Sequence, residues 1–136
     1  MARTEAESTA LVLVVERDPH VRDLEAFFLN EAGYSVEFAE DGLVALAMAR
    51  TTVPAIIVTE ILVPKLDGLA LCRAVKSDAR LCNTQVLVFS ILAASARARE
   101  AGADAFLMKP LAERRLVDTV RDLISKREQT IQGEQA

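Results

Sequence analysis

The stretch PAIIVTEILVPKLDG, residues 54–68, decides how the chain folds. Its residues 55–59, AIIVT, form a continuous apolar run of strand length, which is typical of a strand covered on both faces. The run stops at Glu60, and the Pro64 and Asp67–Gly68 that follow favour a loop leading into a helix. Glu60 is therefore expected at the carboxyl end of a buried strand, where open α/β sheets bind their ligands.

Four further apolar runs and five segments of helical length alternate along the chain. The predicted strands cover residues 10–15, 34–39, 55–59, 85–90 and 104–108, and the predicted helices cover residues 19–32, 41–50, 66–76, 93–101 and 111–126. Gly33 and Gly102 follow two of the helical segments, where glycine favours a helix end, and Pro19 suits a first turn. The alternation predicts a doubly wound α/β fold around a five-stranded parallel sheet.

The composition is that of an ordinary globular domain. The chain has 136 residues, of which 51% are hydrophobic and 26% charged. A net charge of -4 and the lack of a basic stripe argue against nucleic-acid binding. No apolar run reaches the length of a membrane span, and the first residues lack the apolar core of a signal peptide, so we expect a cytoplasmic protein.

The two ends of the sequence differ from its centre. Residues 1–9 and 128–136 are polar and lack apolar periodicity. Segments of this composition bury too little apolar surface to order themselves. We therefore expect flexible ends on both sides of a domain that covers residues 10–127.

Charged and polar residues mark the ends of four predicted strands. The first strand is followed by Glu16 and Arg17, the third by Glu60 and the fifth by Lys109, while the fourth strand ends in Ser90. This ordered set resembles the receiver domain of two-component response regulators. That family carries an acidic pair after its first strand, an aspartate ending the third, Thr or Ser ending the fourth and Lys-Pro after the fifth.

Two further signatures support the resemblance, which covers nearly the whole chain. Pro64, Asp67 and Gly68 follow Glu60 with the spacing of the family's Asp-x-x-x-Pro-x-x-Asp-Gly pattern, and AGADAFLMKP at residues 101–110 is close to the family's AGADDYLxKP. The resemblance implies the flavodoxin-like (βα)5 receiver fold. It also implies a signalling role in a phosphorelay rather than an enzymatic one.

A working receiver, by the same resemblance, holds magnesium between three carboxylates and accepts a phosphoryl group on the third strand's aspartate. The acidic pair falls on Glu16 and Arg17, the phosphoacceptor on Glu60, and the hydroxyl and lysine that hold the phosphoryl group on Ser90 and Lys109. None of the three carboxylate positions keeps an aspartate, and two cations now face two carboxylates. Magnesium prefers a site rich in oxygen ligands, so we expect no metal and no other cofactor.

Two of the departures should also stop phosphorylation. Arg17 places a permanent cation where the metal would bind, and we expect it to pair with Glu60 or Glu16. Glutamate at position 60 is longer than aspartate by one bond, roughly 1.5 Å, and phosphoryl transfer depends on in-line positioning. Glu60 thus resembles a fixed, partial mimic of the phosphorylated state.

Three other residues near the predicted site have less direct roles. Asp18 precedes Pro19 and is expected to cap the first helix, and Asp67 is expected to be structural. Phe106 lies at the family's switch aromatic, three residues before Lys109. With Glu60 fixed, the ring of Phe106 should keep one dominant rotamer, packed in the core and coupled to Ser90.

The usual output surface of receivers is formed by the fourth helix, the fifth strand and the fifth helix, here residues 93–101, 104–108 and 111–126. Lys109 lies 19 positions after Ser90, a shorter spacing than the family's usual one. A shorter fourth helix implies an altered surface for a signalling partner. The sequence does not decide whether the chain also forms a homodimer through this surface. Ile91 and Leu92 could be exposed apolar contacts there.

Three readings of the function remain after the sequence has been weighed. The favoured one is a receiver-like interaction module that is not phosphorylated. A second is a divergent but active receiver, which takes phosphate on another acid such as Asp18 or holds magnesium through Glu16 and Glu60. A third is an unrelated α/β enzyme or small-ligand binder, although the sequence offers neither a nucleophile beside a base nor a Gly-rich loop.

Overall fold

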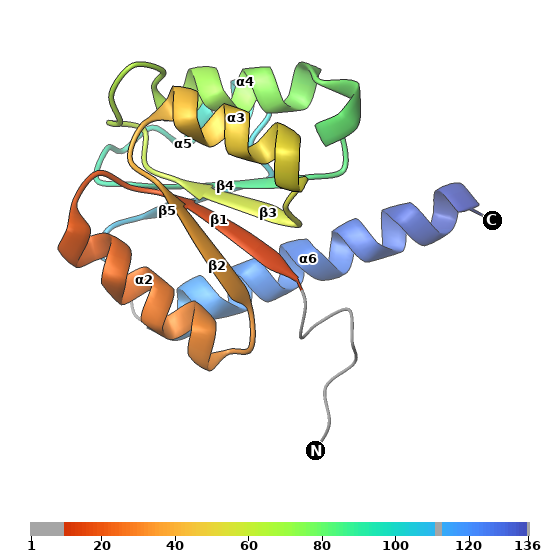
Figure 1. Ribbon diagram of the computed structural model, residues 1–136, viewed down its shortest axis with the longest axis horizontal. Helices are drawn as coiled ribbons and strands as arrows, with labels where there is room; N and C mark the ends of the chain where they lie inside the picture. Colours follow the sequence, from red (N-terminus) through yellow and green to blue (C-terminus); the bar gives the residue numbers. More distant parts are fainter. Residues whose placement is uncertain (1–9, 111–112, 136) are drawn as a thin grey trace.

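A computed structural model of the chain describes residues 10–110 and 113–135. In chain order the elements are β1 (Leu11–Val15), α2 (Pro19–Glu31), β2 (Ser35–Ala39), α3 (Gly42–Thr52), β3 (Ile56–Thr59), α4 (Gly68–Ser77), the 3-10 helix η1 (Ala79–Leu81), β4 (Gln85–Ser90), α5 (Ser95–Glu100), β5 (Ala105–Met108) and α6 (Glu113–Gln135). The strands form one parallel sheet in the order β2-β1-β3-β4-β5. Helices α3, α4 and α5 cover one face of this sheet, and α2 and α6 cover the other (Figure 1).

The strand order places the predicted site at the centre of the sheet. β1 pairs with β2 on one side and with β3 on the other, so the chain changes direction across the sheet at β1. Val15 is in register with Thr59, which brings the next residues of both strands, Glu16 and Glu60, to one edge. This is the position where doubly wound sheets bind ligands.

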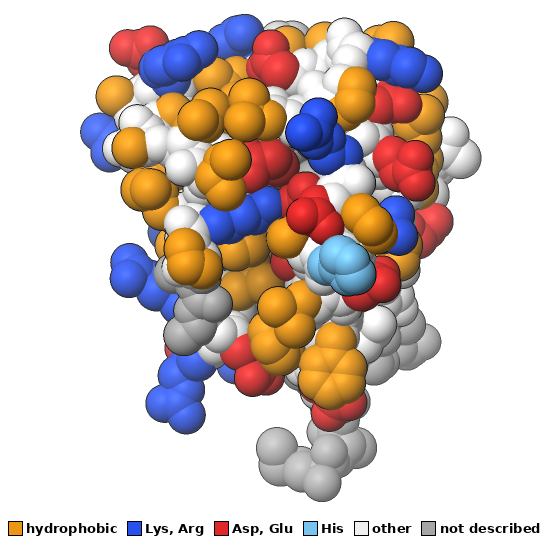
Figure 2. Space-filling view, turned by 90° about the vertical axis from the view of Figure 1, so that its left-hand side faces the viewer, with side chains coloured by type: hydrophobic (Ala, Val, Ile, Leu, Met, Phe, Trp, Pro, Cys, Tyr) orange, Lys and Arg blue, Asp and Glu red, His pale blue; other side chains and the backbone are white. Residues whose placement is uncertain are grey.

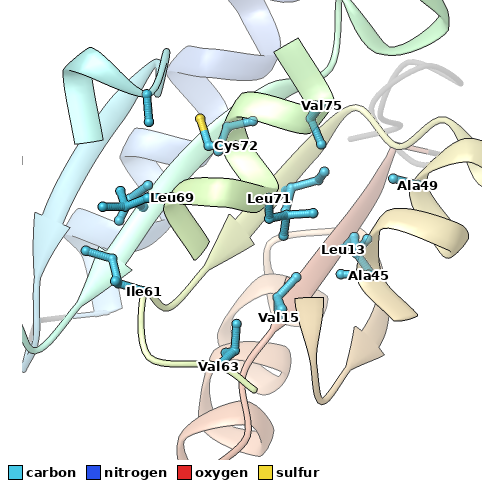
Figure 3. Packing of buried hydrophobic residues seen from close by; sticks show 14 of the residues in the cluster. Leu13, Val15, Ala45, Ala49, Ile61, Val63, Leu69, Leu71, Cys72 and Val75 are labelled. Carbon is cyan, nitrogen blue, oxygen red and sulfur yellow. The ribbon is translucent and has the colours of Figure 1, made fainter. Parts of the chain in front are cut away.

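Each face of the sheet buries its own apolar cluster. Between the sheet and helices α3 and α4 pack residues such as Leu13, Ala45, Leu71 and Val75 (Figure 3). On the opposite face Leu29 of α2 packs in a cluster that α6 also enters through four residues. Those four residues of α6 are Leu116, Val120, Leu123 and Ile124. The two clusters hold the strand ends in fixed positions, because close-packed interiors resist local shifts.

The loop that carries Glu60 into α4 is fixed by two neighbouring residues. Asp67 caps α4, accepting hydrogen bonds from the backbone N–H groups of Leu69 and Ala70 at 2.8 and 2.9 Å. At Gly68 an added Cβ would lie 2.2 Å from the backbone oxygen of Glu60. Only glycine allows this close approach of helix and loop.

The predicted fold class and all five strands are confirmed, and the differences concern helix boundaries. α4 begins at Gly68, because Asp67 provides its cap, and not at residue 66. α5 is shorter than predicted, with only six residues, and its first turn has no side-chain cap. The 3-10 helix η1 was not predicted; Asp78 caps it after α4 ends. Both cysteines are free, with Cys72 buried and Cys82 exposed.

The carboxyl-terminal boundary needs a correction. α6 continues to Gln135, whereas the sequence predicts its end at residue 126 and a tail over residues 128–136. Residues of this segment such as Arg127, Glu128 and Gln129 favour helix, and an Arg127–Glu128 ion pair at 3.0 Å lies within it. The predicted flexible residues 1–9, the first two residues of the predicted fifth helix (111–112) and Ala136 lie outside the described residues. Within the described part of the chain, no helix is long and apolar enough to span a membrane.

Candidate functional site

Four of the predicted site residues meet at the carboxyl edge of the sheet. Glu16 follows β1, Glu60 follows β3, Ser90 ends β4 and Lys109 follows β5. The backbone N–H of Glu60 donates to the carbonyl of Val15 at 3.0 Å, and that of Lys109 donates to the carbonyl of Ser90 at 2.9 Å. Acidic and basic side chains lie together near the middle of this face, with hydrophobic side chains around them (Figure 2).

Lys109 connects the two carboxylates of the site. Its Nζ donates to Glu60 Oε2 at 3.0 Å and also bonds Glu16 Oε1. The three side chains are at most 10% exposed, so water screens these ion pairs weakly. Burial lowers the pKa of Lys109, but the hydrogen bond and charge of Glu16, followed by those of Glu60, outweigh it, and the net pKa is raised. Lys109 therefore stays charged and fixed between its two partners.

Glu60 has a full set of hydrogen-bond donors. Its Oε1 accepts from the Ser90 hydroxyl and from the backbone N–H of Ile61 at 2.7 Å, while its Oε2 accepts from Lys109 and from the N–H of Ile91 at 3.2 Å. Burial raises the pKa of this carboxyl, yet the hydrogen bonds from Ser90 and Lys109 dominate, and the pKa lies below its ordinary value. Glu60 is held as a carboxylate.

The predicted ion pair of Arg17 is wrong. Arg17 is exposed, and none of the ion pairs among the described residues includes its guanidinium. The turn after β1 is closed by Glu16, whose Oε2 accepts from the backbone N–H of Asp18 at 3.1 Å, while Arg17 between them extends to solvent. Lys109 takes the place between the acids that was expected for Arg17.

The residues present do not fit the magnesium site that the family resemblance implies. Glu16 and Glu60 are the only carboxylates in the cluster within the described residues, and both are bonded to Lys109. Asp18 is exposed and caps α2, as predicted, accepting from the N–H of His20 at 2.9 Å. Nowhere in the described part of the chain do three His, Cys, Asp or Glu side chains gather in a way that could hold a metal ion.

Two further predicted residues adjoin the cluster. The Ser90 hydroxyl is fully buried and, besides donating to Glu60, accepts from the backbone N–H of Leu92 at 3.1 Å. Phe106 is half-buried and packs against the apolar cluster beneath α3, α4 and α5. Its burial agrees with the predicted core position, and the single rotamer coupled to Ser90 stays a prediction.

Sequence reasoning missed one charged group beside the cluster, Glu25 of α2. Only 5% of Glu25 is exposed, and burial, followed by the charges of Lys109, Glu16 and Glu60, shifts its pKa. A signal was present in the sequence. Glu25 lies four residues before the buried Leu29, so it shares the face of the helix that turns toward the core.

Comparisons with known proteins agree with this arrangement. The sequence model of the response regulator receiver domain matches residues 12–121. The chain is 30% identical over 118 residues to the DNA-binding dual master transcriptional regulator RpaA of Synechocystis, which covers 85% of this chain and 49% of that protein. It is 35% identical over 118 residues to response regulator MprA of Mycobacterium avium, covering 85% of this chain and 51% of the relative.

A solved structure resembles the chain over most of its length. It is the signal receiver domain of a signal transduction histidine kinase from Syntrophus aciditrophicus, with a TM-score of 0.81, 32% identity and coverage of 86% of this chain and 91% of that one. The present chain spans about half the length of the two curated relatives. The third reading, an unrelated α/β enzyme or binder, is therefore wrong. The chain belongs to the family of response regulator receiver domains, the signalling modules of two-component systems.

Proposed function

We propose that this receiver domain is not phosphorylated at Glu60 and acts through contacts with other signalling proteins. The observation that supports the proposal is the donor set of Glu60. In a working receiver, the family resemblance implies that the hydroxyl and the lysine hold the transferred phosphoryl group. Here Ser90 and Lys109 both donate to the carboxylate of Glu60, together with three backbone N–H groups.

We further propose that the domain works without magnesium and has no enzymatic activity. Magnesium needs several oxygen ligands in octahedral order. Lys109 forms buried ion pairs with both Glu16 and Glu60. A metal ion at this edge would have to displace Lys109 from them. Removing one partner from a buried charge cluster is strongly unfavourable.

The partner surface proposed from the family is formed by α5, β5 and α6. α5 has only six residues, Ser95–Glu100, so this surface differs in shape from one built on a longer helix. The alternative is that a second copy of this chain binds the same surface and forms a homodimer. RpaA is named a DNA-binding regulator. For the present chain, the net charge of -4 favours a protein partner over nucleic acid. We also propose that the domain acts in the cytoplasm.

A phosphodonor assay tests the proposal directly. The protein is incubated with acetyl phosphate and millimolar magnesium, with a conventional receiver in parallel, and its intact mass is measured. We expect no phosphate adduct on this chain and a clear adduct on the conventional receiver. An adduct that maps to Glu60, or to Asp18 as in the divergent active reading, would overturn the proposal.

A double substitution tests why the site is inactive. Arg17→Asp with Glu60→Asp restores an aspartate at both positions, leaving Glu16 as the third acid, and should raise Tm in millimolar magnesium. The matched control is Arg99→Asp with Glu60→Asp, since Arg99 is also an exposed arginine. The control should show no magnesium effect. A magnesium effect on the unsubstituted protein would contradict the proposal.

A further inference from the structure

An apolar cavity of about 300 Å³ lies beside Lys109, on the side of the sheet covered by α2 and α6. Its apolar walls include Leu24 and Phe28 of α2, Phe89 and Ile91 at the end of β4, and Leu116 of α6. Leu24 is 55% exposed and Ile91 is 59% exposed, so these side chains border an open mouth. The face that contains the strand ends is hollowed among its hydrophobic side chains (Figure 2).

One carboxyl oxygen in this apolar wall has no hydrogen-bond partner. Glu25 lines the cavity, is 5% exposed, and its Oε2 is buried without a hydrogen bond. Buried polar atoms in folded proteins are nearly always bonded, so an orphaned oxygen in a cavity wall calls for a cause. Burial, mainly, raises the pKa of Glu25 to about 8. The helix offers it no donor, because its own N–H groups bond within α2.

The charges around the cavity determine which ligand would suit it. Lys109 and Glu113 also line the cavity, but the close bonds of Lys109 go to Glu16 and Glu60 on its other side. Glu16, Glu60 and Glu25 interact with the one ammonium group of Lys109, and Glu113 lines the same cavity. Once Glu25 has released its proton, an additional cation beside it would be attracted by this excess of carboxylates, and an anion would be repelled.

From this geometry we infer that the cavity binds a small organic cation, an amine on a compact hydrocarbon body, whose ammonium group pairs with Glu25. The hydrocarbon body would contact Phe28, Phe89 and Leu116, and the ammonium would donate to Oε2. The volume lies at the lower end for small-molecule sites. A volume of this size suits a ligand body of one ring or a short branched chain. The inference does not depend on whether Glu60 is phosphorylated.

Phenethylamine and phenethyl alcohol test the inference, since they have one hydrocarbon body and differ in charge. Each is titrated at pH 8.5, where most of Glu25 is ionised and the amine stays protonated, into the isotopically labelled full chain, and Kd is obtained from methyl NMR chemical shifts. The amine should bind at least tenfold more tightly than the alcohol, with shifts centred on residues of the cavity. Equal affinity of the two compounds, or no binding of the amine, would overturn the inference.

Three variants locate the contact. Glu25→Gln keeps the side-chain shape and should weaken amine binding at least tenfold, leaving alcohol binding unchanged. Glu31→Gln, on the exposed face of the same helix, should change neither. If Glu25→Gln does not fold, Leu24→Lys at the exposed mouth serves instead. Its added positive charge should also weaken binding of the amine about tenfold. Unchanged amine affinity in a folded Glu25→Gln or Leu24→Lys variant would contradict the site.

Discussion

Two buried glutamates on opposite sides of Lys109 behave in opposite ways. Glu60 and Glu25 are each 5% exposed, and both are influenced by the charge of Lys109. Glu60 accepts hydrogen bonds on both oxygens and has a lowered pKa, whereas Oε2 of Glu25 has no partner and the pKa of Glu25 is raised to about 8. Burial raises the pKa of both carboxyl groups, and only at Glu60 do hydrogen-bond donors outweigh it.

The secondary structure explains the difference in donors. Glu60 follows a strand, where the backbone of the next residues is free to turn its N–H groups toward the carboxylate, as Ile61 does at 2.7 Å. The parallel neighbour β4 adds Ser90 and the N–H of Ile91. Glu25 lies in the middle of α2, where backbone N–H groups bond within the helix. A strand end can thus stabilise a buried charge, and the interior of a helix cannot.

The largest expected effect is on the pH dependence of stability. From an ordinary value of 4.5, the pKa of Glu25 rises to about 8 in the folded protein. Between these values the folded state keeps a proton that the unfolded state has released, so the free energy of unfolding falls as the pH rises. At about 1.4 kcal/mol per pH unit, the loss over this window reaches about 5 kcal/mol. Urea unfolding at a series of pH values from 5 to 8 measures it.

The Glu25→Gln variant isolates this contribution. It should remove most of the decline between pH 5 and pH 8, while Glu31→Gln, which changes an exposed residue of the same helix, should keep it. Glu60 has a lowered pKa and contributes stability that is present above 4.5 and lost as the pH falls through its folded pKa. The two glutamates therefore act in separate pH windows. Parallel curves for the native protein and Glu25→Gln would refute the assignment.

Removing the shared cation should have the next largest effect. Lys109→Met keeps most of the side-chain length but leaves Glu16 and Glu60 buried without their counter-ion. Breaking a buried ion pair in this way costs about 3 kcal/mol or more, and urea unfolding at pH 7 provides the measurement. The matched control is Lys65→Met, because Lys65 pairs with Asp41 at 3.6 Å but its side chain is 63% exposed. The control should change stability by less than about 1 kcal/mol.

A loss in Lys109→Met no larger than that in Lys65→Met would mean that the cluster is open to water. A second comparison strengthens the test. Combining Lys109→Met with Glu60→Gln should destabilise less than the sum of the single changes, because the pair contributes only once. Strict additivity would show that the two side chains do not interact.

The sequence predicts the fold and the position of the site well, for a physical reason. Continuous apolar runs such as residues 55–59 are typical of strands in a sheet that is covered on both faces. Once the strands are parallel, the residues that follow them must share one edge, which brings Glu16, Glu60, Ser90 and Lys109 together. Residue type and strand order are enough for this step.

The partners within the site depend on side-chain direction, which sequence patterns do not define. Arg17 and Lys109 carry the same charge and both follow strands, yet only Lys109 is directed between the acids. The cavity beside Glu25 depends on how α2, β4 and α6 pack, three elements distant in sequence. The helical end of α6 was missed because polar residues predict exposure better than they predict disorder.

Breaking the loop that supplies donors to Glu60 should have a smaller but clear effect. In Gly68→Ala the new Cβ would lie 2.2 Å from the backbone oxygen of Glu60, so the loop must shift. Overpacking of this kind costs about 2 kcal/mol, measured by urea unfolding. Gly133→Ala is the control, since nothing lies within 4 Å of its Cβ and alanine favours helix. Equal stability of Gly68→Ala and the native protein would mean that the loop is not tightly held.

The smallest effect on stability is expected from Arg17→Ala. This substitution tests whether Arg17 or Lys109 balances the charge of Glu60. If Arg17 balanced the charge of Glu60, Arg17→Ala would leave a buried carboxylate unpaired and would destabilise as Lys109→Met does. Arg17 is exposed and Lys109 already bonds Glu60 at 3.0 Å, so we expect a change within about 0.5 kcal/mol in urea unfolding at pH 7. A loss above about 1 kcal/mol would mean that the guanidinium pairs with the acids in solution. The cluster would then hold two cations, and the contrast between Glu60 and Glu25 would rest on charge as well as on hydrogen bonds.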